Sequence, residues 1–345
     1  SIMKALVLKE YNRFEYEDVP LPQVGVDDVL VKVKAAGICG SDVHGMDGSS
    51  GRRKPPIIMG HEAAGVIAEV GENVRLWSRG DRVTFDSTVY CGRCWFCRRG
   101  EINLCDNRMV LGVSCDEYRR DGAFAEYISV PQRILYRIPD GLSFEQAAMV
   151  EPLSIAVHAV KLTSPVQGQT VVVVGVGMIG LLVVQVLRAA GCGRIIAVDI
   201  EQGKLDLAKR FGADVVLKAD ASDVATEVLE LTGGRGADRA FEVVGTATTV
   251  QTALKTLRKG GTLILIGNVA STVEIPLQLV VTRQISLIGS CASAGEYPAC
   301  MEMMANGQVD VKPLTSKVAP LSEGGKWFDR LRDKEPGLLK VILRP

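Results

Sequence analysis

The chain has 345 residues, which is longer than one compact core usually extends and predicts two domains. Its 40 Lys and Arg residues balance 40 Asp and Glu residues, and this zero net charge argues against a protein that binds nucleic acid or an anionic membrane. No apolar run approaches the ~18 residues of a membrane span, and no signal-peptide pattern is visible, so we expect a cytoplasmic globular protein.

The N-terminal part of the chain predicts a compact β-barrel. Short β-rich runs are separated by Gly, Pro and polar turns, for example at residues 29–34, 65–70 and 124–130. Near Glu145 the pattern changes, and apolar residues recur at a helical period over residues 144–162. We therefore expect a helix to lead from the barrel into the second half of the chain.

After Pro165, strands and helices alternate regularly. The predicted strands are 171–174, 194–198, 215–217, 239–242, 262–266 and 285–289. The predicted helices are 179–190, 203–211, 223–232, 248–257 and part of 276–282. This alternation implies an α/β domain with a doubly wound parallel sheet, and the Pro-punctuated C-terminal segment is expected to return to the first domain.

A glycine pattern at the first strand of this sheet predicts a dinucleotide site. Gly175, Gly177 and Gly180 suit a tight turn, an approaching diphosphate and close helix–strand contact. Asp199 ends the next strand, where its carboxylate can accept hydrogen bonds from the adenosine ribose and disfavours a 2′-phosphate, so we expect NAD rather than NADP. The other residues predicted to contact NAD are Met178, Ile179, Ile200 and Lys204.

Two features leave alternatives open at this site. Asp199 could be an ordinary helix N-cap. Lys204 and Arg210 could partly relieve the repulsion between Asp199 and a 2′-phosphate, which would admit NADP.

The nine cysteines divide into a cluster and scattered residues. Four thiolates in one short segment suit a closed tetrahedral zinc site with a structural role. These predicted ligands are Cys91, Cys94, Cys97 and Cys105. An iron–sulfur cluster, a redox disulfide and a nucleic-acid zinc ribbon are the alternatives. A disulfide framework is disfavoured by the odd total, and we expect the remaining cysteines apart from Cys39 to pack as small apolar residues.

A second, open metal site is indicated closer to the N-terminus. Cys39 and His61 are ligand types that a catalytic zinc prefers, and the carboxylates of Glu62 and Glu151 can complete its shell. Spacing alone cannot pair Cys39 with His61, and each could instead be a buried residue without a metal.

Together these segments resemble the zinc-dependent medium-chain alcohol dehydrogenase family. The motifs occur from end to end of the chain in the family's order: Cys39-Gly-Ser-Asp-x-His44, Gly60-His-Glu62, the four-cysteine segment, Asp81-Arg-Val83, Glu151-Pro-Leu153 and the glycine pattern. The resemblance implies a GroES-like β-barrel catalytic domain formed by residues 1–155 and 291–345. A Rossmann NAD-binding domain is implied at residues 156–290, with two zinc ions per chain.

The resemblance also implies roles for individual residues. Cys39 and His61 would bind the catalytic zinc, with Glu62 beside the histidine. Glu151 stands where classical alcohol dehydrogenases have a cysteine ligand, an exchange that the polyol dehydrogenase branch shows, and would bind zinc directly or through water.

The chemistry implied by the family is oxidation of an alcohol by NAD. Zinc would lower the pKa of the substrate hydroxyl, and the alkoxide carbon would give its hydride to the nicotinamide. Ser41 would pass the proton towards His44 by way of the nicotinamide ribose. Without this chemistry, Ser41 and His44 would be a helix cap and a solvated surface residue.

The branch that the chain resembles most is that of sorbitol (L-iditol 2-) dehydrogenases, with galactitol-1-phosphate dehydrogenases as near relatives. We therefore expect oxidation of a polyol to a ketose. Polyol enzymes often carry an Arg-Tyr pair after the Rossmann sheet, where this chain has Cys291-Ala-Ser-Ala-Gly-Glu-Tyr297, which counts against sorbitol itself. Arg52 and Arg53 could hold a substrate phosphate, although we expect them to be solvated loop charges.

Other functions fit less well or remain alternatives. L-threonine and 2,3-butanediol dehydrogenases share the scaffold. A zinc-free quinone reductase would lack Cys39, His61 and the four-cysteine segment, and an inactive NAD-binding protein would show broken ligand positions. We expect a small-molecule substrate, no nucleic-acid or membrane partner, and a homodimer or homotetramer that associates through the apolar segment 273–289.

Overall fold

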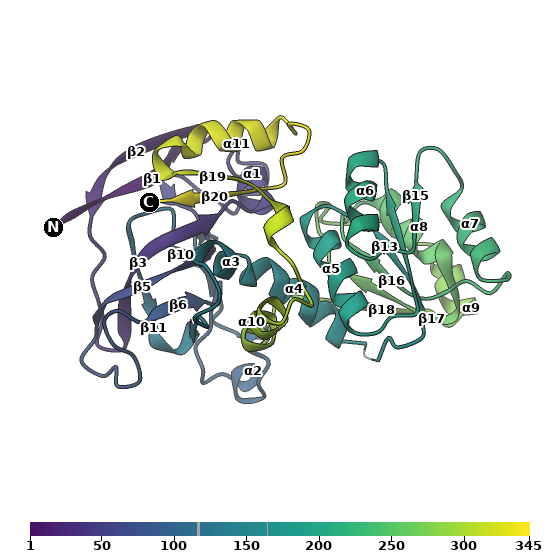
Figure 1. Ribbon diagram of the computed structural model, residues 1–345, viewed down its shortest axis with the longest axis horizontal. Helices are drawn as coiled ribbons and strands as arrows, with labels where there is room; N and C mark the ends of the chain where they lie inside the picture. Colours follow the sequence, from purple (N-terminus) through teal and green to yellow (C-terminus); the bar gives the residue numbers. More distant parts are fainter. Residues whose placement is uncertain (116–117, 164) are drawn as a thin grey trace. The chain divides into compact units, whose positions relative to one another are not determined.

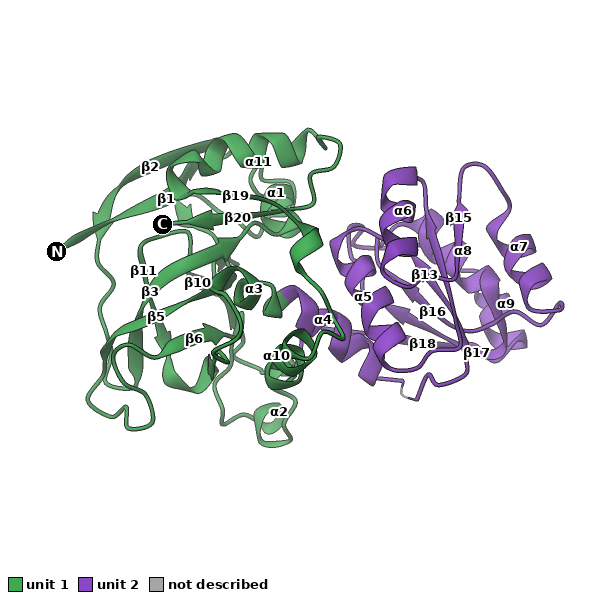
Figure 2. Cartoon of the chain, viewed as in Figure 1, with its two compact units in different colours: residues 1–151, 294–345 green, residues 152–293 purple. Residues whose placement is uncertain are grey.

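The computed structural model describes residues 1–115, 118–163 and 165–345. The chain forms two compact units (Figures 1 and 2): unit 1 comprises Ser1–Glu151 and Ala294–Pro345, and unit 2 comprises Pro152–Ser293. The sequence prediction placed the corresponding divisions after residues 155 and 290. Within the described ranges, no helix combines the length and the apolar character that a membrane span requires.

Unit 1 is built on a seven-stranded sheet. Its strands in spatial order are β12 (Leu135–Arg137), β6 (Arg82–Phe85), β5 (Glu62–Val70), β3 (Asp28–Gly37), β20 (Lys340–Arg344) and β19 (Thr315–Pro320), with β11 (Tyr127–Pro131) also paired to β3. The last strand, β20, pairs antiparallel with β3, so that Leu343 lies opposite Ala36 and Ile342 opposite Gly37. The C-terminal segment therefore belongs to the same sheet as the N-terminal strands.

Further strands and helices complete unit 1. The strands are β1 (Ile2–Glu10), β2 (Arg13–Pro20), β4 (Ile57–Ile58), β7 (Thr88–Val89), β8 (Met109–Val110), β9 (Val113–Ser114) and β10 (Arg119–Arg120). The α-helices are α1 (Gly40–Gly45), α2 (Trp95–Arg98), α3 (Phe144–Ala148), α10 (Tyr297–Ala305) and α11 (Gly324–Arg332). Their apolar side chains form one core that includes Phe85, Phe124 and Phe328, all fully buried.

Unit 2 is a doubly wound parallel sheet, as the sequence predicts (Figure 1). The strands in spatial order are β15 (Val215–Lys218), β14 (Arg194–Asp199), β13 (Thr170–Val174), β16 (Ala237–Glu242), β17 (Leu257–Leu265) and β18 (Ser286–Gly289). The connecting helices are α5 (Met178–Ala189), α6 (Gln202–Arg210), α7 (Val224–Leu231), α8 (Ala247–Thr256) and α9 (Leu277–Thr282). Residues 171–174 of the central strand are almost completely buried, which suits a strand covered on both faces.

Two predicted elements differ from the observed ones. The helix expected over residues 144–162 is two helices, α3 and α4 (Val150–Lys161). Pro152 explains the break, because in one continuous helix it would remove a backbone hydrogen bond and clash with the carbonyl of Ala148. Strand β17 begins at Leu257 rather than at Thr262, although Gly260 and Gly261 lower the strand propensity of its first half.

The cysteines follow the expected division with one exception. All nine are free. Cys192 and Cys300 are buried and Cys115 is half-buried, but Cys291 is exposed. The prediction that every scattered cysteine packs as an apolar residue is therefore wrong for Cys291.

Candidate active site

Three potential metal ligands meet in unit 1. The sulfur of Cys39, a ring nitrogen of His61 and a carboxylate oxygen of Glu62 all lie within 4.8 Å of one another. Cys39 follows β3 as the N-cap of α1, whereas His61 directly precedes β5 and Glu62 begins it. Antiparallel pairing places Gly37 of β3 opposite Glu62 of β5. The sheet register therefore joins two motifs whose spacing in the sequence could not pair them.

A buried carboxylate that the sequence analysis did not assign lies behind these ligands. Asp42 is 0% exposed, and its Oδ2 accepts the backbone N–H of Cys39 at 3.2 Å. Its Oδ1 lies 3.6 Å from Nδ1 of His61. A carboxylate on one side of an imidazole orients the ring and leaves the other nitrogen for a metal.

Arg53 neutralises this carboxylate. Its Nη2 lies 3.2 Å from Asp42 Oδ1 and its Nε at 3.3 Å, and the side chain is only 4% exposed. The expectation of a solvated loop charge is therefore wrong for Arg53, because the arginine is buried against its counter-ion. Arg52, by contrast, is exposed.

A second buried ion pair holds Glu62. Lys340 Nζ lies 2.6 Å from Oε1 and 3.0 Å from Oε2 of Glu62, and it also donates to the carbonyl of Ile38 at 2.8 Å. Burial lowers the pKa of Lys340, but the Glu62 carboxylate outweighs it, and the net shift of the pKa is upwards. Lys340 was not predicted from the sequence, although a lysine directly before the apolar residues of a C-terminal strand was a signal that a buried partner exists.

The charged groups around the three ligands favour the binding of a divalent cation. Burial, followed by the negative charge of Glu62, raises the pKa of the Cys39 thiol to about 12. Burial also raises the pKa of Glu151 to about 8, and His61 opposes that shift. Since Lys340 and Arg53 already neutralise one carboxylate each, ionising Cys39 and Glu151 requires further positive charge. The donor set of thiol, imidazole and carboxylate fits zinc.

Glu151 lies outside the group of three converging atoms. It is 7% exposed, and its Oε1 accepts the hydroxyl proton of Ser87 at 3.2 Å. The structure thus brings Cys39, His61 and Glu62 together and places Glu151 in the same buried, electrostatically linked environment.

Ser41 and His44 are exposed on α1. Ser41 Oγ donates a hydrogen bond to the sulfur of Cys39 at 3.2 Å and accepts a hydrogen bond from Arg53 Nη2 at 3.3 Å. Among the described residues, no hydrogen bond joins Ser41 to His44. The N-cap of α1 is Cys39, so Ser41 is not the helix cap that the alternative interpretation required.

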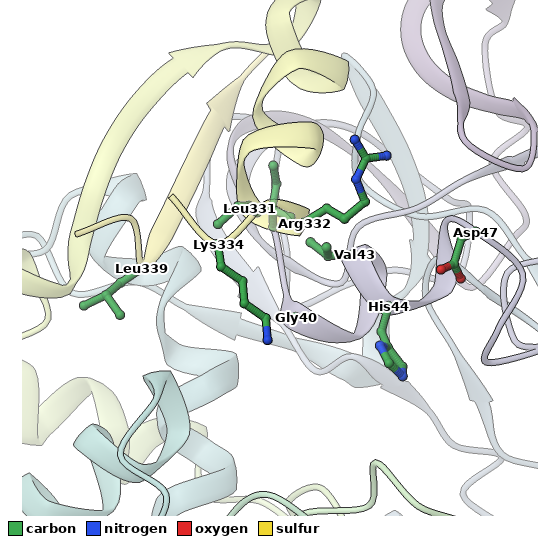
Figure 3. A pocket seen from close by; sticks show the side chains of 9 residues that line it. Gly40, Val43, His44, Asp47, Leu331, Arg332, Lys334 and Leu339 are labelled. Carbon is green, nitrogen blue, oxygen red and sulfur yellow. The ribbon is translucent and has the colours of Figure 1, made fainter. Parts of the chain in front are cut away.

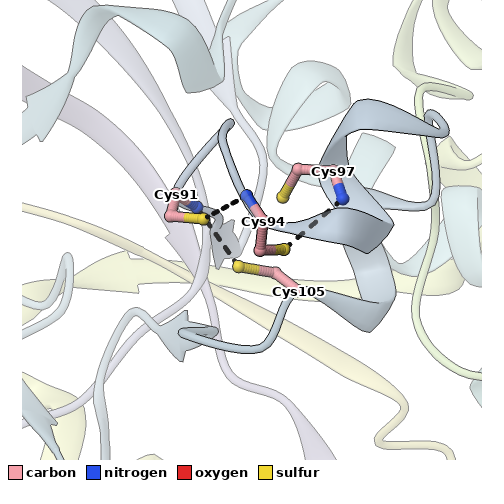
Figure 4. A group of neighbouring side chains, drawn as sticks. All are labelled: Cys91, Cys94, Cys97 and Cys105. Atoms are coloured by element: carbon pink, nitrogen blue, oxygen red, sulfur yellow. Dashed lines mark hydrogen bonds between the residues drawn. The ribbon is translucent and has the colours of Figure 1, made fainter.

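The four clustered cysteines also converge (Figure 4). The four sulfur atoms, of Cys91, Cys94, Cys97 and Cys105, all lie within 4.8 Å of one another. Backbone N–H groups point at the sulfurs: Cys94 donates to Cys91 at 3.3 Å, and Cys97 donates to Cys94 at 3.5 Å. The backbone N–H of Arg93 is the main cause that lowers the pKa of Cys91 to about 6. Donors of this kind stabilise thiolates, so the segment fits a closed zinc site.

The glycine pattern of unit 2 forms the turn between β13 and α5. Gly175 has a φ of 93°, and a Cβ on Gly180 would overlap the carbonyl oxygen of Gly175. Gly177 is the N-cap of α5, and a Cβ there would meet no atom within 4 Å. The backbone conformation of Gly175 and the close packing at Gly180 therefore require glycine, whereas the fold does not require glycine at Gly177.

Asp199 lies at the end of β14, next to this turn. Its Oδ2 accepts the N–H of Val176 at 2.9 Å, and its Oδ1 accepts the N–H of Glu201 at 3.0 Å. The N-cap of α6 is Glu201, so the alternative interpretation of Asp199 as that cap is wrong. Ile200 is 62% exposed, and Lys204 is paired with Glu201 at 3.2 Å. Met178 and Ile179, in the first turn of α5, are half-buried.

Two further buried polar side chains in unit 1 were not identified from the sequence. Tyr297 is fully buried and stacks on Tyr136 with ring centroids 4.9 Å apart. Burial is the main cause that raises the pKa of Tyr297, followed by Asp86 and Glu151. Asp86 is 1% exposed, and burial raises its pKa to about 6. Neither residue belongs to a recognisable local motif.

Comparisons with known proteins agree with this arrangement. Residues 25–140 match the alcohol dehydrogenase GroES-like domain, and residues 178–306 match the zinc-binding dehydrogenase family. The chain is 37% identical to a sorbitol dehydrogenase of Bacillus subtilis (strain 168), with 99% of this chain and 97% of the relative covered.

Solved structures are similar along their whole length. A putative zinc-binding dehydrogenase from Sinorhizobium meliloti 1021, bound to NADP, has a TM-score of 0.90 and 33% identity, with 100% of both chains covered. A galactitol-1-phosphate dehydrogenase from Escherichia coli has a TM-score of 0.92 and 27% identity, with 99% of this chain and 100% of that chain covered.

Proposed function

Since the chain belongs to the zinc-containing alcohol dehydrogenase family, we propose that it oxidises a secondary alcohol of a polyol to a ketone and transfers the hydride to NAD. The observation that carries the proposal is the convergence of Cys39, His61 and Glu62 within 4.8 Å, at a site whose two buried cations, Lys340 and Arg53, are already paired with Glu62 and Asp42. The 37% identity to a sorbitol dehydrogenase supports a polyol as the substrate class.

In this proposal Cys39, His61 and Glu62 hold the catalytic zinc, and Glu151 completes its shell directly or through water. A zinc ion bound there supplies a Lewis acid that lowers the pKa of a substrate hydroxyl. Asp42 Oδ1 lies 3.6 Å from Nδ1 of His61, where it would favour one orientation of the imidazole, and Lys340 fixes the carboxylate of Glu62. The second zinc, held by the four clustered cysteines, stabilises an exposed segment that has little apolar core of its own.

Ser41 and His44 carry the proton away from the substrate. The hydroxyl of Ser41 acts as a hydrogen-bond donor, to Cys39, and as an acceptor, from Arg53, so with substrate bound it could accept the substrate proton and pass its own proton towards His44 in place of the bond to Cys39. His44 is exposed on the same helix and has no hydrogen bond to Ser41 in the described part of the chain, so it would be the final proton acceptor once bound NAD placed a ribose hydroxyl between the two residues.

Asp199 supports the choice of NAD over NADP. One carboxylate oxygen accepts the N–H of Val176 in the turn after β13 and the other accepts the N–H of Glu201 after β14, so the negative charge cannot easily turn away from a 2′-phosphate. Lys204 is already paired with Glu201, which reduces its ability to compensate.

The proposal is tested by NAD reduction across polyols, polyol phosphates, L-threonine and vicinal diols. We expect the highest kcat/KM with a polyol, and a zinc content of about two per chain. Cys39→Ser should remove one zinc and nearly all activity, whereas Cys291→Ser, at an exposed cysteine outside both clusters, should change neither. Full activity of Cys39→Ser, or a clear preference for threonine or butanediol, would contradict the proposal.

We further propose a cytoplasmic homo-oligomer formed through unit 2. Strand β18 is an edge strand of the parallel sheet, and apolar side chains are exposed on it and on α9. Their exposed fractions are 37% for Leu287, 66% for Leu277 and 69% for Val281. An edge strand beside exposed apolar residues suits pairing with a second copy.

A further inference from the structure

Helix α11 ends at a lysine in the left-handed backbone region. Lys334 has a φ of 53° and follows the C-cap residue Asp333. Its N–H donates to the carbonyl of Leu331 at 3.1 Å, and the N–H of Glu335 donates to Arg330 at 3.2 Å. These are the two hydrogen bonds of a Schellman motif, in which glycine is the usual residue at this position. A lysine here costs stability, because its Cβ crowds the backbone.

The charge of Lys334 is not used within the helix end. The other charged side chains of this segment pair with one another: Arg330 with Glu335 at 3.3 Å, and Arg332 with Asp333 at 3.3 Å and with Asp329 at 3.4 Å. Lys334 forms no ion pair with any residue that the structure describes. Its ammonium group is therefore available to an external anion.

Lys334 lines a cavity of about 250 Å³ next to α1 (Figure 3). In Figure 3 its side chain extends towards Gly40, while the guanidinium of Arg332 turns away. A Cβ on Gly40 would meet no atom within 4 Å, so space remains open in front of the ammonium group. His44 and Asp47 line the same cavity, and the carboxylate of Asp47 accepts the backbone N–H of Ser49 at 2.8 Å.

We propose that Lys334 binds a phosphate group of a ligand that enters this cavity, and that the backbone strain at Lys334 is retained for this contact. The inference rests on the proposed function, in which Ser41 and His44 of α1 interact with the nicotinamide ribose. In NAD the diphosphate follows that ribose directly, which makes the cofactor the first source of the phosphate. The phosphate of a polyol phosphate is the second source of the same chemistry.

Three variants separate the charge of Lys334 from its backbone conformation. Lys334→Gly relieves the strain and removes the charge, and Lys334→Arg keeps both. Gln284→Gly is the matched control, because Gln284 has a φ of 52° and its N–H donates to Val281 at 3.3 Å in the same motif at the end of α9. The readouts are the Kd of NADH from its fluorescence at low and high salt, the Tm, and kcat/KM for a polyol and its phosphate.

We expect Lys334→Gly to keep or raise the Tm and to weaken NADH binding about tenfold or more at low salt, with less effect at high salt. Lys334→Arg and Gln284→Gly should bind NADH as the wild type does. If Lys334→Gly keeps the NADH affinity of the wild type but loses kcat/KM for the polyol phosphate alone, the phosphate that Lys334 binds belongs to the substrate.

The inference is overturned if Lys334→Gly changes neither NADH affinity nor the preference for phosphorylated substrate. It is also overturned if Gln284→Gly weakens NADH binding to the same extent. NADH binding is measured without substrate, so weaker binding in Lys334→Gly supports the inference even if no polyol is oxidised. If the protein oxidises a polyol but Lys334→Gly changes neither the Kd of NADH nor kcat/KM for the polyol phosphate, the inference is wrong and the proposed function still stands.

Discussion

The two buried lysine and arginine side chains of unit 1 each neutralise a carboxylate near the predicted metal ligands. Lys340 contacts both oxygens of Glu62, and their side chains are 3% and 0% exposed. Lys340→Met would leave the Glu62 carboxylate buried without a counter-ion, and we expect it to destabilise unit 1 by about 3–5 kcal/mol. Urea unfolding followed by tryptophan fluorescence measures this, because all three tryptophans lie in unit 1.

The matched control for this prediction is the double variant Glu62→Gln/Lys340→Met. It removes both charges, so it should recover a substantial part of the lost stability. A double variant that is less stable than Lys340→Met would show that the ion pair is not the main contribution of these two residues.

Asp86 provides a pH-dependent test at a single residue. Burial raises its pKa from 3.8 to about 6, so the folded state holds the proton more tightly than the unfolded state. The contribution of Asp86 to the free energy of unfolding should therefore fall as pH rises from about 4 to about 6 and then stay level. Asp86→Asn does not titrate, and relative to the wild type it should gain up to about 3 kcal/mol between pH 4 and pH 7.

The Tm of both proteins, measured across this pH range, checks the prediction. Thr88 N–H donates to Oδ1 of Asp86 at 2.9 Å, a bond that an asparagine can keep. A constant difference in Tm between Asp86→Asn and the wild type from pH 4 to pH 7 would show that the carboxyl group has its ordinary pKa in the folded state.

Residue types were easier to predict than residue partners. Cys39, His61 and Glu62 were candidates because thiol, imidazole and carboxylate groups are zinc ligand types, but only the family resemblance assigned them to one site. The convergence of their donor atoms became visible only from the register of β3 and β5. Arg53 was expected to be solvated, because nothing near it in the sequence shows that Asp42 accepts its side chain.

At the scale of elements, the turn between β13 and α5 contains one glycine that the packing requires and another that only cofactor binding would require. A Cβ on Gly180 would overlap the carbonyl of Gly175, so Gly180→Ala should lower both the Tm and the affinity for NAD. A Cβ on Gly177 would meet no atom within 4 Å, so Gly177→Ala should keep the Tm. If Gly177 faces the diphosphate, this variant should still bind NADH about tenfold or more weakly.

NADH fluorescence titration and thermal unfolding of the two variants check this pair of predictions. Wild-type affinity in Gly177→Ala would contradict the assignment of Gly177 to the cofactor site. A wild-type Tm in Gly180→Ala would contradict the requirement for close contact between α5 and the preceding turn.

Elements of unit 2 were predicted better than those of unit 1. The parallel strands are continuous apolar runs separated by amphipathic helices, a local pattern that sequence periodicity records directly. The predicted bounds of two elements were wrong because tertiary context determines them. Pro152 divides one predicted helix into α3 and α4, and β17 extends back to Leu257 through its pairing with β16. In unit 1 the strands are short, and their pairing order depends on contacts between distant segments.

At the scale of the whole chain, the candidate active site depends on both ends of the sequence. Strand β20 pairs with β3 and brings Lys340 to Glu62, which lies 278 positions earlier in the chain. The family resemblance implied that the C-terminal segment returns to the first domain. It did not specify that this segment supplies a buried positive charge, Lys340, beside the predicted metal ligands, because that depends on the register of one strand pair.

The assembly of the molecule is tested at the edge of unit 2. In a two-fold interface through β18, Leu287 of each copy would lie near its counterpart, so Leu287→Lys would replace apolar contact with two like charges. We expect association to weaken about a hundredfold or more, with monomers observed by size-exclusion chromatography and light scattering at micromolar concentration. Leu76→Lys is the matched control, since Leu76 is 85% exposed in unit 1 and should not affect assembly. An unchanged oligomer in Leu287→Lys, or a monomeric wild type, would rule out association through β18. A monomeric variant that still binds NADH would show that each chain binds its cofactor independently of a partner chain.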